Sequence, residues 1–214
     1  MCRMQLIGML DSPYVRRVAI SLQLLGLPFE HRSLSVFRTF DQFRAINPVV
    51  KAPTLVCDDG TVLMDSSLII DYAEALAAPR SLMPHGLAER QAALRAIGLG
   101  LAACEKSIQL VYERNLRPPE KQHEPWAARV LGQMHAAFEE LEADLAKRPQ
   151  RPAGQRIDAA DVSTAVAWHF TERTLPATVK DAAYPRLREL SAWAEQLPEF
   201  LSAPHGDGTV RPRH

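Results

Sequence analysis

The stretch DSPYVRRVAISL, residues 11–22, decides how the first part of the chain folds. Ser12 is a residue type that commonly caps a helix N-terminus, and Pro13 suits the first helical position. Apolar residues then recur at steps of three and four, as on one face of a helix: Val15, Val18, Ala19, Leu22 and Leu25. Gly26 and Pro28 end this pattern. The stretch therefore predicts one helix that starts at Ser12 and Pro13.

The segments on both sides of this helix predict a small α/β sheet. MQLIGML, residues 4–10, is a short apolar run with the length of a buried strand. Asp59 and Gly60 lie between two further apolar runs and form a strong hairpin signal. After the first helix we predict a strand in 29–36, a helix in 40–47, hairpin strands in 53–57 and 61–64, and a helix in 66–76. This order is typical of a small α/β domain.

Beyond Ala78 and Pro79 the strand signals disappear and the pattern becomes helical. One long helix is predicted from Leu94, Ile97, Leu101, Cys104, Ile108 and Val111, and a second from Val130, Met134, Phe138, Leu141 and Leu145. Further helices are predicted in 162–170 and 187–197. We therefore expect two domains, an α/β domain in 1–80 and an all-α domain in 88–205. The tail 204–214 is expected to be loose.

The composition is that of a globular chain without overall charge. The 214 residues are 47% hydrophobic and 23% charged, and the formal net charge is zero. A neutral chain gives no reason to expect nucleic acid or an acidic membrane as a partner. The N-terminal MCRMQLIGML runs into a predicted strand, so we expect neither a signal peptide nor a membrane span.

The cysteines and histidines argue against a metal site. Cys2, Cys57 and Cys104 are widely spaced and belong to no CxxC motif or Cys/His cluster. This spacing disfavours a disulfide framework and a structural zinc site. The seven histidines show no metal-ligand spacing either. We expect no metal ion and a reducing, cytoplasmic location.

Two readings of Ser12 remain open from its own position. Helix initiation alone explains a serine followed by a proline. A helix N-terminus, however, gathers unpaired N–H groups and partial positive charge, so a hydroxyl there could also hold a thiolate. As a hydrogen-bond donor, Ser12 would lower the pKa of a bound thiol, whose reactive form is the thiolate.

The stretches NPVVKAPTLV and MDSSLIIDYAE carry the same ambiguity. Pro53 precedes a strand and is either an ordinary strand-entry proline or part of a cis bond that turns the backbone of Ala52 toward a ligand. Lys51 is either a solvated charge or a ligand contact. Asp65 and Ser66 open a helix, which capping explains, and the same geometry could bind a carboxylate at Ser66 and an amino group at Asp65.

The Ser-Pro-Tyr-x-Arg-Arg helix start, the KAPTL proline and the DSSLII helix start, in this order, resemble the thioredoxin-like N-terminal domain of cytosolic glutathione transferases. The chain is similar to the serine-type and related bacterial classes. The all-helical remainder is similar to the family's second domain, so the resemblance covers nearly the whole chain. IDAADVSTA resembles the family's capping box, with Asp158 as N-cap, Asp161 three residues later and Ile157 against Val162. The family usually has Ser or Thr in place of Asp158.

The resemblance implies a role for each residue of the three motifs. Ser12 would be the catalytic residue and would donate a hydrogen bond to the sulfur of glutathione. Ala52 would pair through its backbone with the cysteinyl unit, and the peptide bond between Ala52 and Pro53 would be cis. Lys51 could reach the glycyl carboxylate. Asp65 and Ser66 would hold the amino and carboxylate groups of the γ-glutamyl unit.

The sequence says much less about which residues line a pocket for the second substrate. In the family it is lined by the strand–helix turn and by the long helices of the second domain, which points to Tyr14, Tyr112, Arg114 and Trp168. Some classes use a catalytic tyrosine, but it lies before this helix, so Tyr14 is interpreted as a helix residue near the site. Arg114 either guides an acidic electrophile or belongs to a charged helix end with a Glu113–Arg117 pair. Trp168 is more often a core residue than a ligand contact.

Taken together, the resemblance implies a glutathione transferase that activates the thiol for attack on a small, largely apolar electrophile. Conjugation, isomerisation and dehalogenation all need the half of the site that binds glutathione and activates its thiol. The alternative is a glutathione-binding or stress-response interaction protein with the same fold. A glutathione-dependent reductase is disfavoured because Ser12 stands where such relatives carry a cysteine. By analogy we expect a homodimer, with glutathione as co-substrate.

Overall fold

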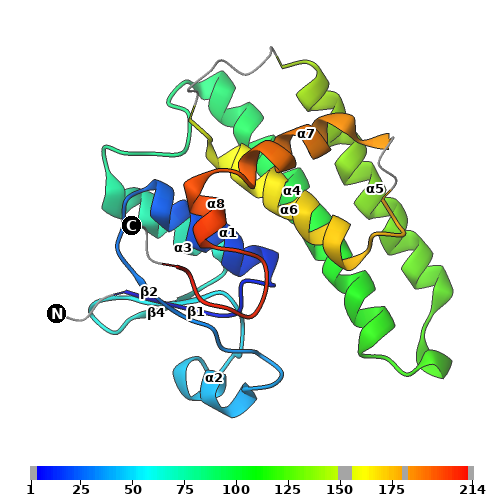
Figure 1. Ribbon diagram of the computed structural model, residues 1–214, viewed down its shortest axis with the longest axis horizontal. Helices are drawn as coiled ribbons and strands as arrows, with labels where there is room; N and C mark the ends of the chain where they lie inside the picture. Colours follow the sequence, from blue (N-terminus) through cyan, green and yellow to red (C-terminus); the bar gives the residue numbers. More distant parts are fainter. Residues whose placement is uncertain (1–3, 149–155, 180–182, 212–214) are drawn as a thin grey trace. The chain divides into compact units, whose positions relative to one another are not determined.

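The computed structural model describes residues 4–148, 156–179 and 183–211 (Figure 1). These residues form two compact units. The first contains 4–82 together with 195–211, and the second contains the described residues between 83 and 194. The segment that begins at Glu195 thus belongs to the first unit, whereas the range 88–205 had been expected for the second.

A four-stranded mixed sheet organises the first unit. Its strands are β1 (Gln5–Ile7), β2 (Glu30–Arg32), β3 (Thr54–Val56) and β4 (Val62–Met64), in the spatial order β2-β1-β3-β4. β1 runs parallel to β2 and antiparallel to β3, and β3 and β4 form an antiparallel hairpin. Leu6 lies between His31 and Leu55 in this register. The predicted order of strands and the hairpin are confirmed.

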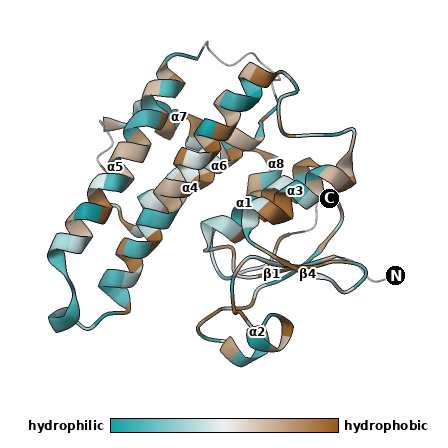
Figure 2. Cartoon of the chain, turned by 180° about the vertical axis from the view of Figure 1, so that it is seen from behind, coloured by the Kyte–Doolittle hydropathy of each residue, from teal (hydrophilic) through white to brown (hydrophobic). Residues whose placement is uncertain are grey.

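Four helices complete the first unit: α1 (Pro13–Leu24), α2 (Phe40–Ile46), α3 (Ser66–Ala77) and α8 (Pro198–Ser202). In Figures 1 and 2, α1 and α3 cover one face of the sheet and α2 lies on the other. The predicted apolar face of α1 is buried, since Val15, Val18 and Leu22 are fully inaccessible to solvent. Ser12 is the N-cap and Pro13 the first residue of α1, as the opening stretch predicts.

The second unit is helical and contains α4 (Leu87–Asn115), the short 3-10 helix η1 (Pro119–Lys121), α5 (Glu124–Ala146), α6 (Ala159–Thr174) and α7 (Pro185–Ala194). α4 packs closely on α6, because a Cβ added at Gly100 would lie 3.3 Å from the carbonyl oxygen of Ser163. The alternation of hydrophilic and hydrophobic turns along these helices is visible in Figure 2. The long helices predicted from periodicity are confirmed.

Asp158 caps α6, as predicted. Its side chain accepts a hydrogen bond from the backbone N–H of Asp161 at 2.8 Å. Asp161 itself forms an ion pair with Arg148 at 2.7 Å. Burial and, to a smaller extent, the charge of Asp161 raise the pKa of Asp158. The capping chemistry is therefore kept with Asp in place of Ser or Thr, although this carboxylate lies in an unfavourable environment.

The C-terminal segment packs against the first unit through polar contacts. Arg16, which is 1% exposed, donates to the carbonyl of Ala203 at 2.8 Å and forms a two-bond ion pair with Glu195 at 2.6 and 2.7 Å. Further along, the backbone N–H of Val210 donates to Nδ1 of His31 at 3.0 Å. Residues 204–211 of the expected loose tail are thus attached, and 212–214 lie outside the described residues.

The two ring nitrogens of His31 make different bonds, which predicts a loss of stability in acid. Nε2 lies 2.7 Å from the carbonyl of Gly8 and must donate to it, while Nδ1 accepts from Val210. Only the neutral imidazole can do both. Burial accordingly lowers the pKa of His31 from its ordinary 6.5, against a smaller opposing effect of the Gly8 carbonyl.

Because the unfolded chain binds this proton more readily, the stabilisation by His31 is complete above pH about 6.5 and is lost as the pH falls through the folded-state pKa. We expect the free energy of unfolding, measured by urea titration between pH 7 and 5, to fall less steeply in His31→Gln than in the parent protein. Identical slopes in the two proteins would contradict the assignment of the neutral ring.

Candidate active site

The turn between β1 and α1 presents the hydroxyl of Ser12. The backbone N–H of Ser12 donates to the carbonyl of Met9 at 3.2 Å, and Ser12 is partly exposed. Its Oγ accepts from the backbone N–H of Val15 at 3.5 Å, which is a long capping bond. Capping uses only a lone pair of the oxygen, so the hydroxyl hydrogen remains able to donate to a bound group. Both readings of Ser12 are compatible with this geometry.

The Ala52–Pro53 peptide bond is cis, as the resemblance implied. The loop is held by Thr54, whose hydroxyl donates to the carbonyl of Lys51 at 2.7 Å and accepts from Nδ2 of the buried Asn47 at 2.8 Å. Glycine is required at position 8, where φ is +137° and an added Cβ would lie 3.2 Å from Cβ of Ala52. Ala52 is thus placed directly beside the end of β1.

The N-terminus of α3 lies close to this loop. Asp65 is the N-cap, with φ of 73°, and its side chain accepts from the backbone N–H of Ser67 at 2.9 Å. Its other carboxylate oxygen lies 3.8 Å from Nζ of Lys51. A non-glycine residue with positive φ carries strain that the surrounding structure must offset, and such residues are enriched at ligand-binding sites. The Lys51–Asp65 contact thus brings Lys51 close to the start of α3, where Asp65 and Ser66 lie.

Arg17 joins the two helix starts, and the sequence reading gave it no role. Its guanidinium is on α1, is buried with the residue 5% exposed, and donates to Oγ of Ser66 at 3.1 Å and to Oγ of Ser67 at 3.2 Å. Ser66 is itself only 3% exposed. The signal in the sequence was the unusual pair of arginines inside an otherwise apolar helix, but the spacing did not indicate that both are buried.

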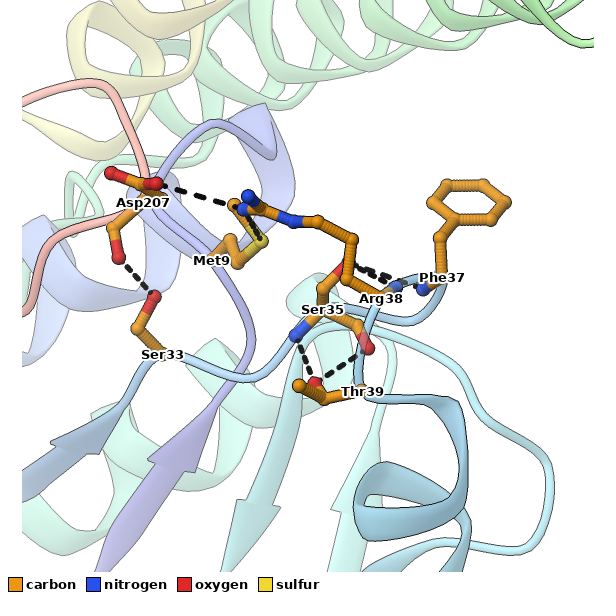
Figure 3. Close-up of polar contacts among 7 residues, drawn as sticks. All are labelled: Met9, Ser33, Ser35, Phe37, Arg38, Thr39 and Asp207. Atoms are coloured by element: carbon orange, nitrogen blue, oxygen red, sulfur yellow. Dashed lines mark hydrogen bonds and ion pairs between the residues drawn. The ribbon is translucent and has the colours of Figure 1, made fainter.

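A second polar cluster beside Ser12 was also missed (Figure 3). Arg38 reaches back over the β1–α1 turn, donates to Sδ of Met9 at 3.5 Å and lies 3.6 Å from a carboxylate oxygen of Asp207. Desolvation raises the pKa of Asp11, while the backbone N–H of Ser12 and the charge of Arg38 oppose that rise. A charged group from the C-terminal segment therefore lies next to the residue that precedes Ser12.

Hydrogen bonds fix the loop that carries Arg38. The backbone N–H of Ser35 donates to Oγ1 of Thr39 at 2.8 Å, and the backbone N–H groups of Phe37 and Arg38 donate to Oγ of Ser35 at 3.2 and 3.0 Å. In Figure 3 the ring of Phe37 points away from Arg38, and Phe37 is 56% exposed. The loop therefore presents the guanidinium of Arg38 to Met9 in the β1–α1 turn, whereas the ring of Phe37 is exposed and points away from it.

The four residues predicted to line a second-substrate pocket are distributed over the two units. Tyr14 is partly buried on α1, and Tyr112 on α4 is 44% exposed. Arg114 forms a two-bond ion pair with Glu124 at 2.5 and 3.0 Å. The charged helix end weighed as the alternative is present as well, with Arg117 paired to Glu113 at 2.9 Å.

Trp168 requires a correction. It is 1% exposed and packs edge-on against Phe138, with ring centroids 5.3 Å apart, and against Tyr184 at 5.4 Å. A side chain enclosed in this way fills the core of the second unit and cannot line a pocket. The alternative reading of Trp168 as a packing residue is the one that holds, because its large apolar surface is most stable out of water.

Across residues 4–148, 156–179 and 183–211, no group of three or more His, Cys, Asp or Glu side chains could hold a metal ion. Within the same described ranges, no helix has the length and apolar character needed to cross a membrane.

Comparison with known proteins gives matches in both units. The family model "Glutathione S-transferase, N-terminal domain" matches residues 6–81, and "Glutathione S-transferase, C-terminal domain" matches 124–192. A maleylacetoacetate isomerase from Pseudomonas aeruginosa is 28% identical over 195 residues, which cover 87% of this chain and 89% of that protein.

Two solved structures are similar over their full length. A glutathione transferase family member from Pseudomonas fluorescens Pf-5 with bound glutathione has a TM-score of 0.79 and 26% identity, covering 99% of this chain and 100% of that one. A glutathione S-transferase from Methylobacterium radiotolerans in complex with glutathione sulfonate has a TM-score of 0.82 and 27% identity, covering 99% of both chains. With a thioredoxin-like α/β unit, a helical unit and both domain models matched, the chain belongs to the glutathione S-transferase family.

Proposed function

We propose that this protein binds glutathione and activates its thiol for attack on a small, largely apolar electrophile. The observation that carries the proposal is that three segments of the first unit lie close together. They are the turn before α1, the loop that carries Lys51 and Ala52, and the start of α3. Gly8 brings Ala52 to the end of β1, Lys51 contacts Asp65, and Arg17 joins the start of α1 to the start of α3. Ser12 lies in the turn that leads into the same helix α1.

The chemistry follows from this arrangement. The backbone of Ala52 offers pairing to the cysteinyl unit of glutathione. Asp65 would hold the γ-glutamyl amino group, Ser66 its carboxylate and Lys51 the glycyl carboxylate. The thiol is then held at the N-terminus of α1, where the partial positive charge and the Ser12 hydroxyl favour the thiolate. Similar structures that contain bound glutathione or glutathione sulfonate support this ligand.

Isomerisation is the second candidate for the reaction. It is favoured by the similarity to a maleylacetoacetate isomerase over most of both chains. A glutathione-dependent isomerisation begins with the same thiolate, which adds to the substrate and later leaves, so the two candidates share Ser12 and differ in the electrophile. Assays with a maleyl-type substrate and with an aromatic conjugation substrate would separate them.

The proposal is tested by the pKa of the glutathione thiol on the protein. We expect thiolate absorbance, recorded against pH with saturating glutathione, to give a pKa well below that of free glutathione. Binding without this shift would support the alternative of a non-catalytic glutathione-binding protein. Absence of binding would overturn the proposal.

We place the protein in the cytoplasm, in keeping with cysteines that form no disulfide among the described residues.

We further propose a homodimer, and α3 offers a face for it. Leu68, Tyr72 and Leu76 follow one another at steps of four and are 65%, 37% and 47% exposed, and Val62 and Met64 on the neighbouring β4 are 41% and 38% exposed. Exposed apolar side chains that recur along one face of a helix are typical of an interaction surface. The hydropathy colouring of α3 in Figure 2 shows its hydrophobic turns.

We expect the double change Leu68→Asp, Leu76→Asp to convert a dimer into a monomer, as measured by sedimentation equilibrium, because two carboxylates would be desolvated at the interface. The control is Leu201→Asp on α8, which is also exposed, at 56%, but lies on another element. A dimer that persists in the double variant would place the interface elsewhere.

A further inference from the structure

His31 connects the end of β1 with the C-terminal segment 204–211. It lies on β2, and Nε2 of its ring donates to the carbonyl of Gly8, the residue that follows β1, at 2.7 Å. On the other side of the ring, Nδ1 accepts from the backbone N–H of Val210 at 3.0 Å. One partly buried imidazole therefore holds the strand that leads into the β1–α1 turn and a segment from the far end of the chain.

The other side-chain contacts that hold this segment near the turn are exposed. Oγ of Ser33 donates to the backbone carbonyl of Asp207 at 2.6 Å, and the carboxylate of Asp207 lies 3.6 Å from the guanidinium of Arg38 (Figure 3). Both side chains of this ion pair are largely exposed, at 66% and 75%. Exposed pairs contribute little to stability, so the bond from Val210 to His31 is the contact whose loss matters most.

We propose that His31 is a pH-dependent latch for residues 207–211. The neutral ring holds them beside the β1–α1 turn, and the ring that carries a proton on both nitrogens releases them. The released segment takes the carboxylate of Asp207 away from Arg38, which leaves the guanidinium without that partner next to the turn that leads to Ser12. The latch goes beyond the proposed function and does not depend on it, because it needs no ligand.

Donor and acceptor rules determine which bond of His31 breaks. A protonated imidazole has two donors and no acceptor. The carbonyl of Gly8 still accepts from Nε2, so the bond to the end of β1 survives. The backbone N–H of Val210 would then face a second N–H group on Nδ1, and two donors cannot bond. Protonation therefore acts on the C-terminal segment and leaves the sheet intact.

The direction of the pH effect follows from burial of the ring. Burial lowers the pKa of His31 from its ordinary 6.5, and the carbonyl of Gly8 opposes this by a smaller amount. The released ring binds a proton more readily, so attachment is complete above pH about 6.5 and is lost as the pH falls through the pKa of the attached ring.

No neighbouring charge is among the causes of this lowered pKa. β1 contributes only uncharged residues, and side chains alternate along a strand, so the flanking charges of β2 point to the opposite face from His31. The charged residues of the elements around His31 are Glu30 and Arg32 on β2, Asp11 in the β1–α1 turn, Arg38 in the following loop, and Asp207 and Arg211 in the C-terminal segment.

The test is hydrogen exchange of single backbone amides, expressed as protection factors, which correct for the pH dependence of intrinsic exchange. Between pH about 7.5 and 5 we expect the protection of the Val210 N–H to fall about three- to tenfold. The N–H of Arg211, which donates to the carbonyl of Ser202 at 2.8 Å, should lose protection over the same pH range. The N–H of Gly8, which donates to the carbonyl of Arg32 in the sheet, should keep its protection.

Two substitutions of His31 fix the latch in one state. In His31→Gln the side-chain amide offers a donor and an acceptor but does not titrate, so protection of Val210 should no longer depend on pH. In His31→Lys the side chain only donates, so protection of Val210 should be about tenfold lower than in the parent protein at pH about 7.5. The control is Asp207→Asn, which removes the ion pair with Arg38 and should leave the pH dependence in place.

Three results would overturn the latch. The first is protection of Val210 that stays constant while the ¹⁵N shifts of the His31 ring report its protonation. The second is loss of protection at Val210 alone, because Arg211 would then remain attached and nothing would be released. The third is an unchanged pH dependence in His31→Gln, which would assign the effect to another group.

Discussion

Replacing Ser12 by Ala is expected to lower kcat/KM with a conjugation substrate by about 10²-fold at pH 6.5, while the Kd of glutathione changes little. Loss of a single hydrogen-bond donor to an anion such as a thiolate lowers the rate by about this factor when the site is partly shielded from water. In the proposed site, affinity for glutathione would come mainly from Ala52 and the N-terminus of α3, which the substitution leaves in place. The loss should therefore appear as a higher pKa of the bound thiol, read from thiolate absorbance.

The pH dependence separates this effect from a folding defect. As the pH rises toward the pKa of a free thiol, the sulfur ionises without help, so the activities of Ser12→Ala and the parent protein should converge. Ser12→Thr keeps the hydroxyl and is the control. The capping bond from Val15 is long, at 3.5 Å, so we expect Ser12→Ala to cost less than about 1 kcal/mol of stability. A constant ratio of activities from pH 6 to 9 would contradict the assigned role.

Local signals explain why much of the fold could be predicted from the sequence. Ser12 and Pro13 specify a helix start by their own chemistry, and Asp59 with Gly60 specifies a hairpin, in which Gly60 has φ of +86°. Asp158 caps α6 for the same reason. In each case, the residues that determine the structure are within a few positions of one another, so no knowledge of distant packing is needed.

Contacts between residues far apart in the chain could not be predicted in this way. Arg17 meets Ser66 across 49 positions, and Arg16 meets Glu195 across 179. Nothing in the helical pattern of α1 distinguishes these two arginines from surface residues, which is the usual place for arginine. The burial of Trp168 likewise depends on residues from other segments, Phe138 and Tyr184, and therefore could not be established from its own helix. The family resemblance implied roles for Ala52 and Ser66 but none for Arg17.

The C-terminal segment from Glu195 groups with the first unit, and the Arg16–Glu195 pair holds it there. Changing Glu195 to Gln is expected to lower the free energy of unfolding of the first unit by about 3 kcal/mol, because it leaves a guanidinium that is 1% exposed without its carboxylate. The remaining contacts of Arg16, to the carbonyl of Ala203 and to the face of the Phe200 ring at 5.5 Å, cannot neutralise the charge.

The measurement is urea unfolding together with hydrogen exchange of the backbone amides in 195–211. In Glu195→Gln we expect faster exchange at Val210 and Arg211, whose N–H groups donate to His31 and Ser202. The control is Asp207→Asn, which removes the partner of Arg38 in the same segment. That pair is exposed on both sides, at 66% and 75%, so its loss should cost less than about 1 kcal/mol. Equal destabilisation by the two changes would mean that burial of Arg16 is not what fastens this segment to the first unit.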